Sequence, residues 1–252
     1  MADRYDVVVL GAGSGGYATA LRAAQLGLTV GLVEKDKVGG TCLHRGCIPT
    51  KAILHAAEVA DLARAGTQFG IHASIDKIDL AGVRGYADGV VGRLYKGLSS
   101  LISRRGISVI SGEGRLGLID GRPAVQVGDQ ALRADHVVLA SGSYARSLPG
   151  VQVDGERVLT SDHALRLEQL PSSAIVLGGG VIGCEFASAW RSFGVEVTVV
   201  EALPRLLPAE DPAISAALER AFRKRKITVL TGAPVQEAIP ASGGVRLTLP
   251  EG

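Results

Sequence analysis

The chain contains the same glycine-rich pattern twice, and each copy lies between a short apolar run and a helical pattern. The copies run from Gly11 to Gly16 and from Gly178 to Gly183. In both copies another glycine, Gly27 or Gly194, follows 16 residues after the first one, where it suits the end of a helix. This repeated register predicts two β-α-β units, and therefore an α/β fold with two Rossmann-like dinucleotide-binding domains.

Both units also end on an acid. Glu34 and Glu201 each lie 23 residues after the first glycine of their copy. In a dinucleotide site the glycines let the backbone approach the pyrophosphate, and the helix N-terminus offers it free N–H donors. The acid accepts hydrogen bonds from a ribose 2′-OH, so Glu201 predicts a preference for NAD over NADP. The alternative is a pair of tight-turned units that bind no ligand.

A third glycine match, from Gly112 to Gly117, is not expected to bind a nucleotide. The chain has 34 glycines, so a lone match is weak. Gly121 and Pro123 interrupt the stretch where a helix would have to follow. We expect short strands with glycine-rich turns over residues 107–127, and a return strand over residues 137–140.

Two of the three cysteines, Cys42 and Cys47, lie close together just after the first unit. The third, Cys184, falls inside the second nucleotide helix and is expected to be inert. The sequence shows neither a signal peptide nor an apolar run of membrane-spanning length, so we expect a cytoplasmic protein with no membrane partner. In that setting a close cysteine pair is typically catalytic or metal-binding. A zinc site would need a second close pair, and two inert thiols are the other alternative.

A redox role for the pair has a physical basis. Pro49 suits the first turn of a helix over residues 50–64, which places Cys47 near a helix N-terminus, where a thiolate is favoured. Lys51 adds positive charge nearby. The four intervening residues, which include Gly46, can bring the two sulfurs together if the segment is a bent loop and not an ideal helix.

Three stretches resemble the flavin-dependent pyridine nucleotide–disulfide oxidoreductases. The most specific is Gly39 to Lys51, which reads Gly-Gly-Thr-Cys-Leu-His-Arg-Gly-Cys-Ile-Pro-Thr-Lys. Val137 to Ser143 resembles the family's flavin motif, with Ser141 in place of the usual threonine. Gly178 to Glu185 resembles the family's NAD motif, and the similarity runs through the whole chain.

The resemblance implies a role for each matching residue. Cys42 and Cys47 would form the redox disulfide, with Cys47 facing the flavin and Cys42 exchanging with substrate, while Lys51 would lie near the flavin, paired with Glu185. The residues implied to bind FAD are Gly11, Gly13, Gly16, Glu34, Gly40, Thr41, Cys42, Lys51, Gly114, Ser141 and Gly142. Those implied to bind NAD are Gly178, Gly180, Gly183, Glu201 and Val235.

The resemblance also implies an activity and partners. The chain would oxidise dihydrolipoamide, carried on the lipoyl domain of a 2-oxoacid dehydrogenase or glycine cleavage complex, and pass two electrons through FAD to NAD⁺. The full-length protein would be a homodimer. One rival is a mercuric or other disulfide reductase of the same family, and another is a nucleotide-binding fragment without turnover.

Family members continue past Gly252, into a second flavin segment and an interface domain whose partner-supplied histidine, in a His-x-x-x-x-Glu pattern, acts as acid–base. We therefore expect this chain alone to bind FAD weakly or not at all, and not to oxidise dihydrolipoamide. His163 and Glu168 have that spacing, but their stretch looks like an ordinary helix start.

Turn chemistry at residues 148–150 predicts a domain boundary. We expect an FAD-binding domain with the redox disulfide over 1–147, and an NAD-binding domain, truncated, over 148–252. Residues 51–105 should form helices packed over the first sheet. The formal net charge of +2 predicts no nucleic-acid partner, the basic run from Arg223 to Lys226 reads as the solvated last turn of a helix, and the five histidines show no metal-ligand spacing.

Overall fold

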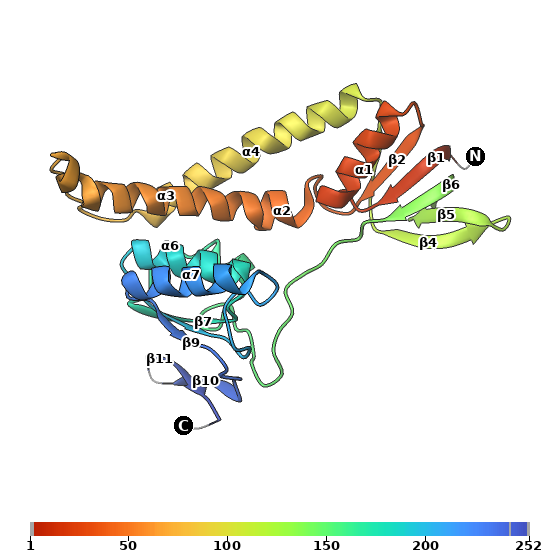
Figure 1. Ribbon diagram of the computed structural model, residues 1–252. Coiled ribbons are helices and arrows are strands. Elements are labelled where there is room, and N and C mark those ends of the chain that lie inside the picture. Colours follow the sequence, from red (N-terminus) through yellow and green to blue (C-terminus); the bar gives the residue numbers. More distant parts are fainter. Residues whose placement is uncertain (1–2, 242, 251–252) are drawn as a thin grey trace. The chain divides into compact units, whose positions relative to one another are not determined.

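The structure, a computed structural model, describes residues 3–241 and 243–250. The chain divides into two compact units (Figure 1). Unit 1 comprises Met1–Pro49 and Asp88–Tyr144, and unit 2 comprises Thr50–Ala87 and Ala145–Gly252. Two long helices, α3 (Cys47–Ala65) and α4 (Leu80–Arg104), therefore each begin in one unit and end in the other.

Unit 1 is built on a six-stranded sheet in the order β3-β2-β1-β6-β5-β4. Strands β1, β2, β3 and β6 pair in parallel, while β4, β5 and β6 pair antiparallel. Helices α1 and α2 lie wholly in this unit, which also holds parts of α3 and α4. The bounds are β1 (Asp3–Leu10), α1 (Ser14–Gln25), β2 (Val30–Glu34), α2 (Gly40–Arg45), β3 (Ser108–Ser111), β4 (Gly114–Ile119), β5 (Arg122–Val127) and β6 (Gln130–Leu139).

The centre of this sheet is buried on both faces, as expected for parallel strands that read as continuous apolar runs. Val7 and Val9 of β1 pack on one side with Leu32 and with Ile102 of α4. Val8 packs on the other side with residues of β5 and β6. Packing on both faces of the sheet therefore holds the end of β1 and the loop that follows it.

The third glycine match lies in strands, as predicted. Gly114 starts β4, and the turn that follows leads into β5 and β6. A side chain at Gly114 would meet Leu10, Val33 and Val125 at 2.5, 2.9 and 3.0 Å. Close packing inside the sheet explains this glycine.

Unit 2 contains the second β-α-β unit. Its three strands pair in parallel in the order β7-β8-β9, and a separate antiparallel hairpin, β10-β11, follows. The bounds are η1 (Gly66–Phe69), α5 (Ser161–Ala164), β7 (Ser173–Leu177), α6 (Val181–Ser192), β8 (Glu196–Val200), α7 (Pro212–Lys224), β9 (Thr228–Leu230), β10 (Glu237–Ala241) and β11 (Gly244–Thr248).

The core of unit 2 has two parts. Val197 and Val199 of β8 pack with Phe222 of α7 and Cys184 of α6. On the other face of α6, Phe186 joins apolar side chains of α3 in a second cluster. We expected residues 51–105 to cover the first sheet. This holds for the end of α4 but is wrong for α3, because Ile53 and Ala57 of α3 pack in one buried cluster with Phe186 of α6.

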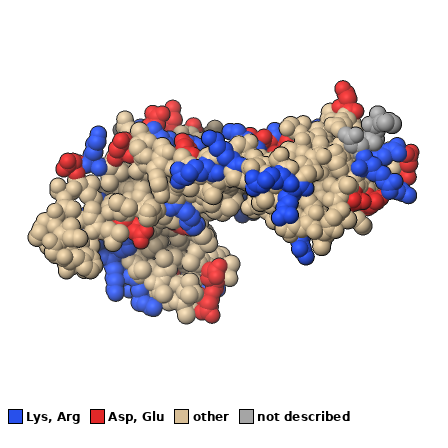
Figure 2. Space-filling view, turned by 90° about the horizontal axis from the view of Figure 1, so that it is seen from above, with Lys and Arg blue, Asp and Glu red and all other residues tan. Residues whose placement is uncertain are grey.

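None of the helices that the structure describes is both long enough and apolar enough to cross a membrane. Acidic and basic side chains both appear on the face shown in Figure 2.

Candidate functional site

The first glycine loop can accept a pyrophosphate. Gly11 has a φ of +101°, and a Cβ there would collide with the carbonyl of Ala140. A Cβ on Gly16 would collide with the carbonyl of Gly11, so α1 packs directly on the loop. Helix α1 starts from Gly13 with no side-chain cap and no acid in its first turn. Its first N–H groups are therefore suited to an anionic ligand.

The second glycine loop repeats this geometry. Gly178 has a φ of +103°, and a Cβ on Gly183 would collide with the carbonyl of Gly178. Helix α6 starts from Gly180, again with no side-chain cap and no acid in its first turn. Gly180 has no neighbour within 4 Å of the place a Cβ would occupy, so its outer face is open. The residues present at both loops fit a dinucleotide.

The acid at the end of each second strand is directed at its own glycine loop. Glu34 Oε2 accepts a hydrogen bond from Ala12 N–H at 2.8 Å. Glu201, which is 8% exposed, accepts one from Gly179 N–H through Oε2 at 2.6 Å. The sequence predicts where these acids lie but not their bonds to the loops.

The cysteine segment packs on the first glycine loop. Gly39, with a φ of +108°, donates its N–H to the carbonyl of Ala12 at 2.8 Å. A Cβ on Gly40 would lie 2.6 Å from Cα of Gly13. Positions 39 and 40 are therefore limited to glycine. Thr41, which is exposed, and Cys42 follow in α2. The residues expected to bind FAD from the first loop and from the cysteine segment are thus neighbours.

The cysteines themselves differ from the expectation in their local structure. Cys42 lies in α2 and not in a bent loop, and α3 begins at Cys47 and not at Thr50. Gly46 separates the helices, and a Cβ there would meet the carbonyl of Thr41 at 3.0 Å and Cα of Cys42 at 3.3 Å. With φ −143° and ψ −115°, Gly46 therefore breaks the helical path just before Cys47. Cys42 is half-buried and Cys47 is exposed, and their disulfide stays a prediction.

His44, which lies between the cysteines, is held by its surroundings. Its Nε2 lies 2.9 Å from the carbonyl of Val38, and its ring packs edge-on against Tyr95 with centroids 5.2 Å apart. Within residues 3–241 and 243–250, no group of three or more His, Cys, Asp or Glu side chains is arranged to hold a metal ion.

Lys51 and Glu185 approach each other, as predicted. Lys51 Nζ lies 2.5 Å from Glu185 Oε1, and the two side chains are 58% and 21% exposed. Because the lysine is more than half exposed, this pair contributes at most about 1 kcal/mol to stability. Removing one partner of a buried ion pair would cost several kcal/mol, but this pair is not buried.

The remaining predicted residues are Ser141, Gly142, Val235 and Gly114. Ser141 and Gly142 follow β6, whose last residue pairs with Leu10, so they share an edge of the sheet with the first glycine loop. Gly142 has a φ of +82°. Val235 is half-buried in the segment between β9 and β10. Gly114 lies in β4, as described above.

His163 caps the short helix α5. Its Nδ1 accepts a hydrogen bond from Thr160 N–H at 3.1 Å, and the two residues form a capping box. The prediction of an ordinary helix start is confirmed, and this geometry gives His163 a structural role.

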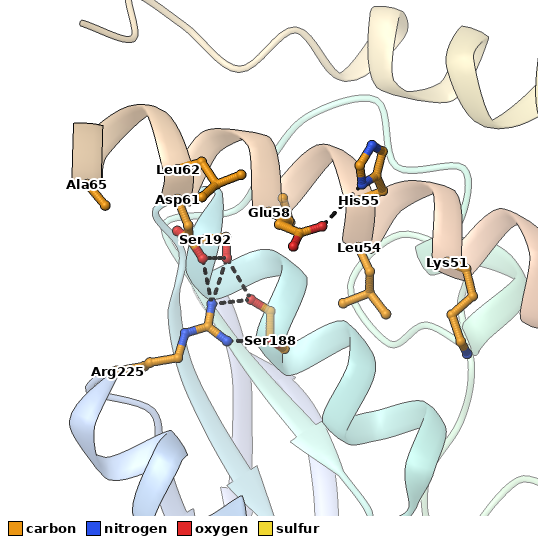
Figure 3. Close-up of a pocket in the computed structure, with 11 residues that line it drawn as sticks. Lys51, Leu54, His55, Glu58, Asp61, Leu62, Ala65, Ser188, Ser192 and Arg225 are labelled. Atoms are coloured by element: carbon orange, nitrogen blue, oxygen red, sulfur yellow. Dashed lines mark hydrogen bonds and ion pairs between the residues drawn. The ribbon is translucent and has the colours of Figure 1, made fainter. Parts of the chain in front are cut away.

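Sequence reasoning missed a polar cluster that joins α3 to α6 and to the end of α7, shown in Figure 3. Ser192 donates to Asp61 Oδ2 at 2.6 Å and accepts from Arg225 at 2.6 Å. Arg225 also bonds Ser188, one turn earlier on α6, and lies 3.3 Å from Asp61. The expectation that the whole basic run is solvated is therefore wrong for Arg225. The spacing of Ser188 and Ser192, four residues apart on a helix, was the only sequence signal.

The cluster borders an open cavity of about 550 Å³. Lys51, His55 and Glu58 line it from α3, and Ser188 and Ser192 from α6. His55 pairs with Glu58 at 3.2 Å. The charged groups that line the cavity thus have partners within the protein: Lys51 pairs with Glu185, and Figure 3 shows the contacts of the others.

A family model described as pyridine nucleotide-disulphide oxidoreductase matches residues 5–252. The chain is 46% identical to a dihydrolipoyl dehydrogenase of Bacillus subtilis, over 93% of this chain and 52% of the relative. It is 40% identical to one of Rhizobium etli, over 97% of this chain and 54% of the relative. The chain therefore spans about half the length of these curated relatives.

Solved structures show the same similarity. The LpdA protein of Mycobacterium tuberculosis matches with a TM-score of 0.89 at 30% identity, over 99% of this chain and 56% of that one. The HOCl-induced flavoprotein disulfide reductase RclA of Escherichia coli matches with a TM-score of 0.80 at 26% identity, over 98% of this chain and 54% of that one.

Proposed function

Because the chain belongs to the pyridine nucleotide–disulphide oxidoreductase family, we propose that it is the dinucleotide-binding part of an FAD-dependent dihydrolipoyl dehydrogenase. The observation that carries the proposal is the packing of the cysteine segment on the first glycine loop, with Gly40 against Gly13. Relatives named dihydrolipoyl dehydrogenase support the choice of substrate.

In this proposal the two halves of the chain bind different cofactors. Residues 1–147 form the FAD-binding domain and residues 148–252 the NAD-binding domain, with the first helix of each unit directed at a pyrophosphate. Bound FAD would carry two electrons between the dithiol and NAD⁺. The site residues are Gly11, Gly13, Gly16, Glu34, Gly40, Thr41, Cys42, Lys51, Gly114, Ser141 and Gly142 for FAD, and Gly178, Gly180, Gly183, Glu201 and Val235 for NAD.

The thiol chemistry is an exchange between two dithiol–disulfide pairs. One substrate thiolate attacks Sγ of Cys42 in the Cys42–Cys47 disulfide, and Cys47 leaves as a thiolate. The second substrate thiol then displaces Cys42, so the substrate becomes the disulfide and both cysteines are reduced. Cys47 is the first residue of α3, where the helix N-terminus stabilises the negative charge of the leaving thiolate.

Lys51 and Glu185 contribute fixed charge near this thiol. Lys51 is one turn after Cys47 on the same helix, so its ammonium group and the helix N-terminus act in the same direction. Glu185 holds the ammonium group in place at 2.5 Å. We assign both residues to the catalytic site on this basis.

Specificity for NAD over NADP rests on Glu201. A carboxylate that accepts from a ribose 2′-OH would repel a 2′-phosphate. Two unit charges about 4 Å apart interact by roughly 4 kcal/mol at an effective dielectric constant near 20, before screening by salt. Glu201 is nearly buried, so the screening is reduced.

The proposal includes partners and a location. The substrate dithiol would be carried on the lipoyl domain of a 2-oxoacid dehydrogenase or glycine cleavage complex, and the full-length protein would be a homodimer. A cytoplasmic location suits a reactive cysteine pair in a chain of three cysteines.

Electron transfer from dithiol to flavin tests the proposal. The full-length protein, loaded with FAD under anaerobic conditions, is treated with dihydrolipoamide, and flavin absorbance and NADH formation are followed. We expect flavin bleaching that disappears in Cys42→Ser and Cys47→Ser and persists in Cys184→Ser, the matched control. The proposal would be overturned if dihydrolipoamide transferred no electrons while NADPH reduced another disulfide or mercuric ion.

A further inference from the structure

Glu201 makes two backbone hydrogen bonds, one with each of its carboxylate oxygens. Oε2 accepts from Gly179 N–H at 2.6 Å, and Oε1 accepts from Leu203 N–H at 2.7 Å. The first bond holds the glycine loop, and the second holds the turn that follows β8. The carboxylate therefore joins the two loops that border the second nucleotide site.

The peptide of Gly179 is also fixed at its carbonyl end. Its oxygen accepts from Leu207 N–H at 2.8 Å and from the thiol of Cys184 at 3.4 Å. A Cβ on Gly179 would lie 3.2 Å from Cβ of Glu201 and closer still to Leu206. These contacts hold the Gly178–Gly180 loop in one position. Glu201 supplies the acceptor for the N–H group of Gly179.

The first unit repeats this arrangement with different residues. Glu34 accepts from Ala12 N–H through Oε2 and from Asp36 N–H through Oε1, at 2.8 and 2.9 Å. The carbonyl of Ala12 accepts from Gly39 N–H at 2.8 Å, as that of Gly179 accepts from Leu207. The two loops have mostly different side chains but the same set of hydrogen bonds. This indicates that the acid has the same structural role in both units.

We propose that Glu201 is a positioning residue of the second nucleotide site, which holds the Gly178–Gly180 loop in its pyrophosphate-binding form before any ligand arrives. The inference rests on the proposed function, in which this site takes NAD. It adds a second role to the acid, because a group that only accepted from a ribose would not need bonds to two loops. A backbone fixed in advance loses less conformational entropy when the pyrophosphate binds.

A consequence concerns cofactor specificity. Replacing Glu201 by a smaller neutral residue removes the repulsion of a 2′-phosphate, but it also leaves Gly179 N–H and Leu203 N–H without their acceptor. The affinity for NAD⁺ should therefore fall, and the gain in affinity for NADP⁺ should be smaller than removal of the repulsion alone would give.

Amide hydrogen exchange without ligand tests the positioning role. In Glu201→Ala, the amides of Gly179 and Leu203 should exchange roughly 10- to 150-fold faster, the effect of losing a hydrogen bond to a charged group. Glu201→Gln keeps one acceptor oxygen, so one of the two amides should stay protected, and this variant carries the test if the alanine variant does not fold. Glu196→Gln, exposed at the start of the same strand, is the matched control. Unchanged exchange in both Glu201 variants would overturn the inference.

Binding of NAD⁺ and of its 2′-deoxyadenosine analogue separates the two roles. If Glu201 acts only on the ribose, Glu201→Ala leaves the affinity for the deoxy analogue unchanged, and the positioning role is wrong. If it also holds the loop, that affinity falls about tenfold or more. A wild-type chain that binds neither dinucleotide would contradict the proposed function, and the exchange data alone would then decide the role of Glu201.

Discussion

At the scale of single residues, the three cysteines have three different environments. Cys47 is exposed at a helix N-terminus, Cys42 is half-buried, and Cys184 is buried in the core of unit 2. Burial raises the pKa of the Cys184 thiol from 9.0 to about 11, and the charges of Glu201 and Glu185 add to the effect. The prediction that Cys184 is inert follows the same physics, since a thiol without its thiolate form is a poor nucleophile.

The raised pKa of Cys184 gives stability a pH dependence. As the pH rises from about 9 to about 11, the unfolded chain loses this proton before the folded chain does. The folded state then binds more protons, so its stability falls over this window and is unaffected below it. We expect the wild type to be more stable than Cys184→Ala at pH 8, with a smaller gap at pH 10.5. Urea unfolding at both values measures this, and a gap independent of pH would contradict it.

At the scale of elements, the start of α1 shows how two adjacent glycines differ. A Cβ on Gly16 would collide with the carbonyl of Gly11, while one on Gly15 would meet nothing within 4 Å. The sequence predicts that this turn contains glycines, but it does not show which of them the packing requires.

Alanine at these two positions should therefore have opposite effects. Gly16→Ala should destabilise unit 1 by about 3 kcal/mol or more, because backbone atoms cannot move aside as a flexible side chain can. Gly15→Ala should be neutral, or stabilising by up to about 1 kcal/mol, because alanine favours helix. Denaturant unfolding of the two variants measures the difference. Equal stabilities would show that the loop relaxes.

The cluster that joins α3 to α6 provides a second test of packing between elements. Ser192 is 4% exposed and bonds both Asp61 and Arg225. Ser192→Ala leaves these two groups without a shared hydroxyl, and we expect a loss of about 1–3 kcal/mol. Ser100→Ala, an exposed serine near the end of α4, is the matched control and should change stability by less than about 0.5 kcal/mol. A thermal shift as small in Ser192→Ala as in the control would contradict the structural role.

Much of the fold could be predicted because local patterns agree with it. Both glycine loops, the strands before them and the acids after them follow from spacing alone. The position of α3 could not be predicted, because its contacts with Phe186 and Ser192 join residues more than a hundred positions apart. The helix around Cys42 was also missed, since a motif identifies the cysteines without fixing the backbone between them.

At the scale of the whole molecule, the chain presents two nucleotide loops that are alike in backbone and different in their neighbours. Only the first has a cysteine segment packed on it, through Gly39 and Gly40. In the second, the corresponding position is taken by Leu206 and Leu207, which follow the turn after β8.

This difference predicts that each loop responds to its own ligand. NADH should slow the amide exchange of residues 178–183 and leave that of residues 11–16 unchanged, because NADH has no flavin and we propose that the loop beside the cysteine segment binds FAD. Exchange measured by mass spectrometry on peptides from the two loops provides the test. Equal protection of both would show that the loops do not discriminate.

Helix α3 also limits how the chain can vary in length. It carries Cys47 and Lys51 in its first turns and Asp61 further along, while α6 carries their partners Glu185 and Ser192. An inserted residue between Lys51 and Asp61 would rotate the two about 100° apart and lengthen the helix by about 1.5 Å. Only one contact with α6 could then be kept, so natural variants of this chain should tolerate substitutions in that stretch far better than insertions or deletions.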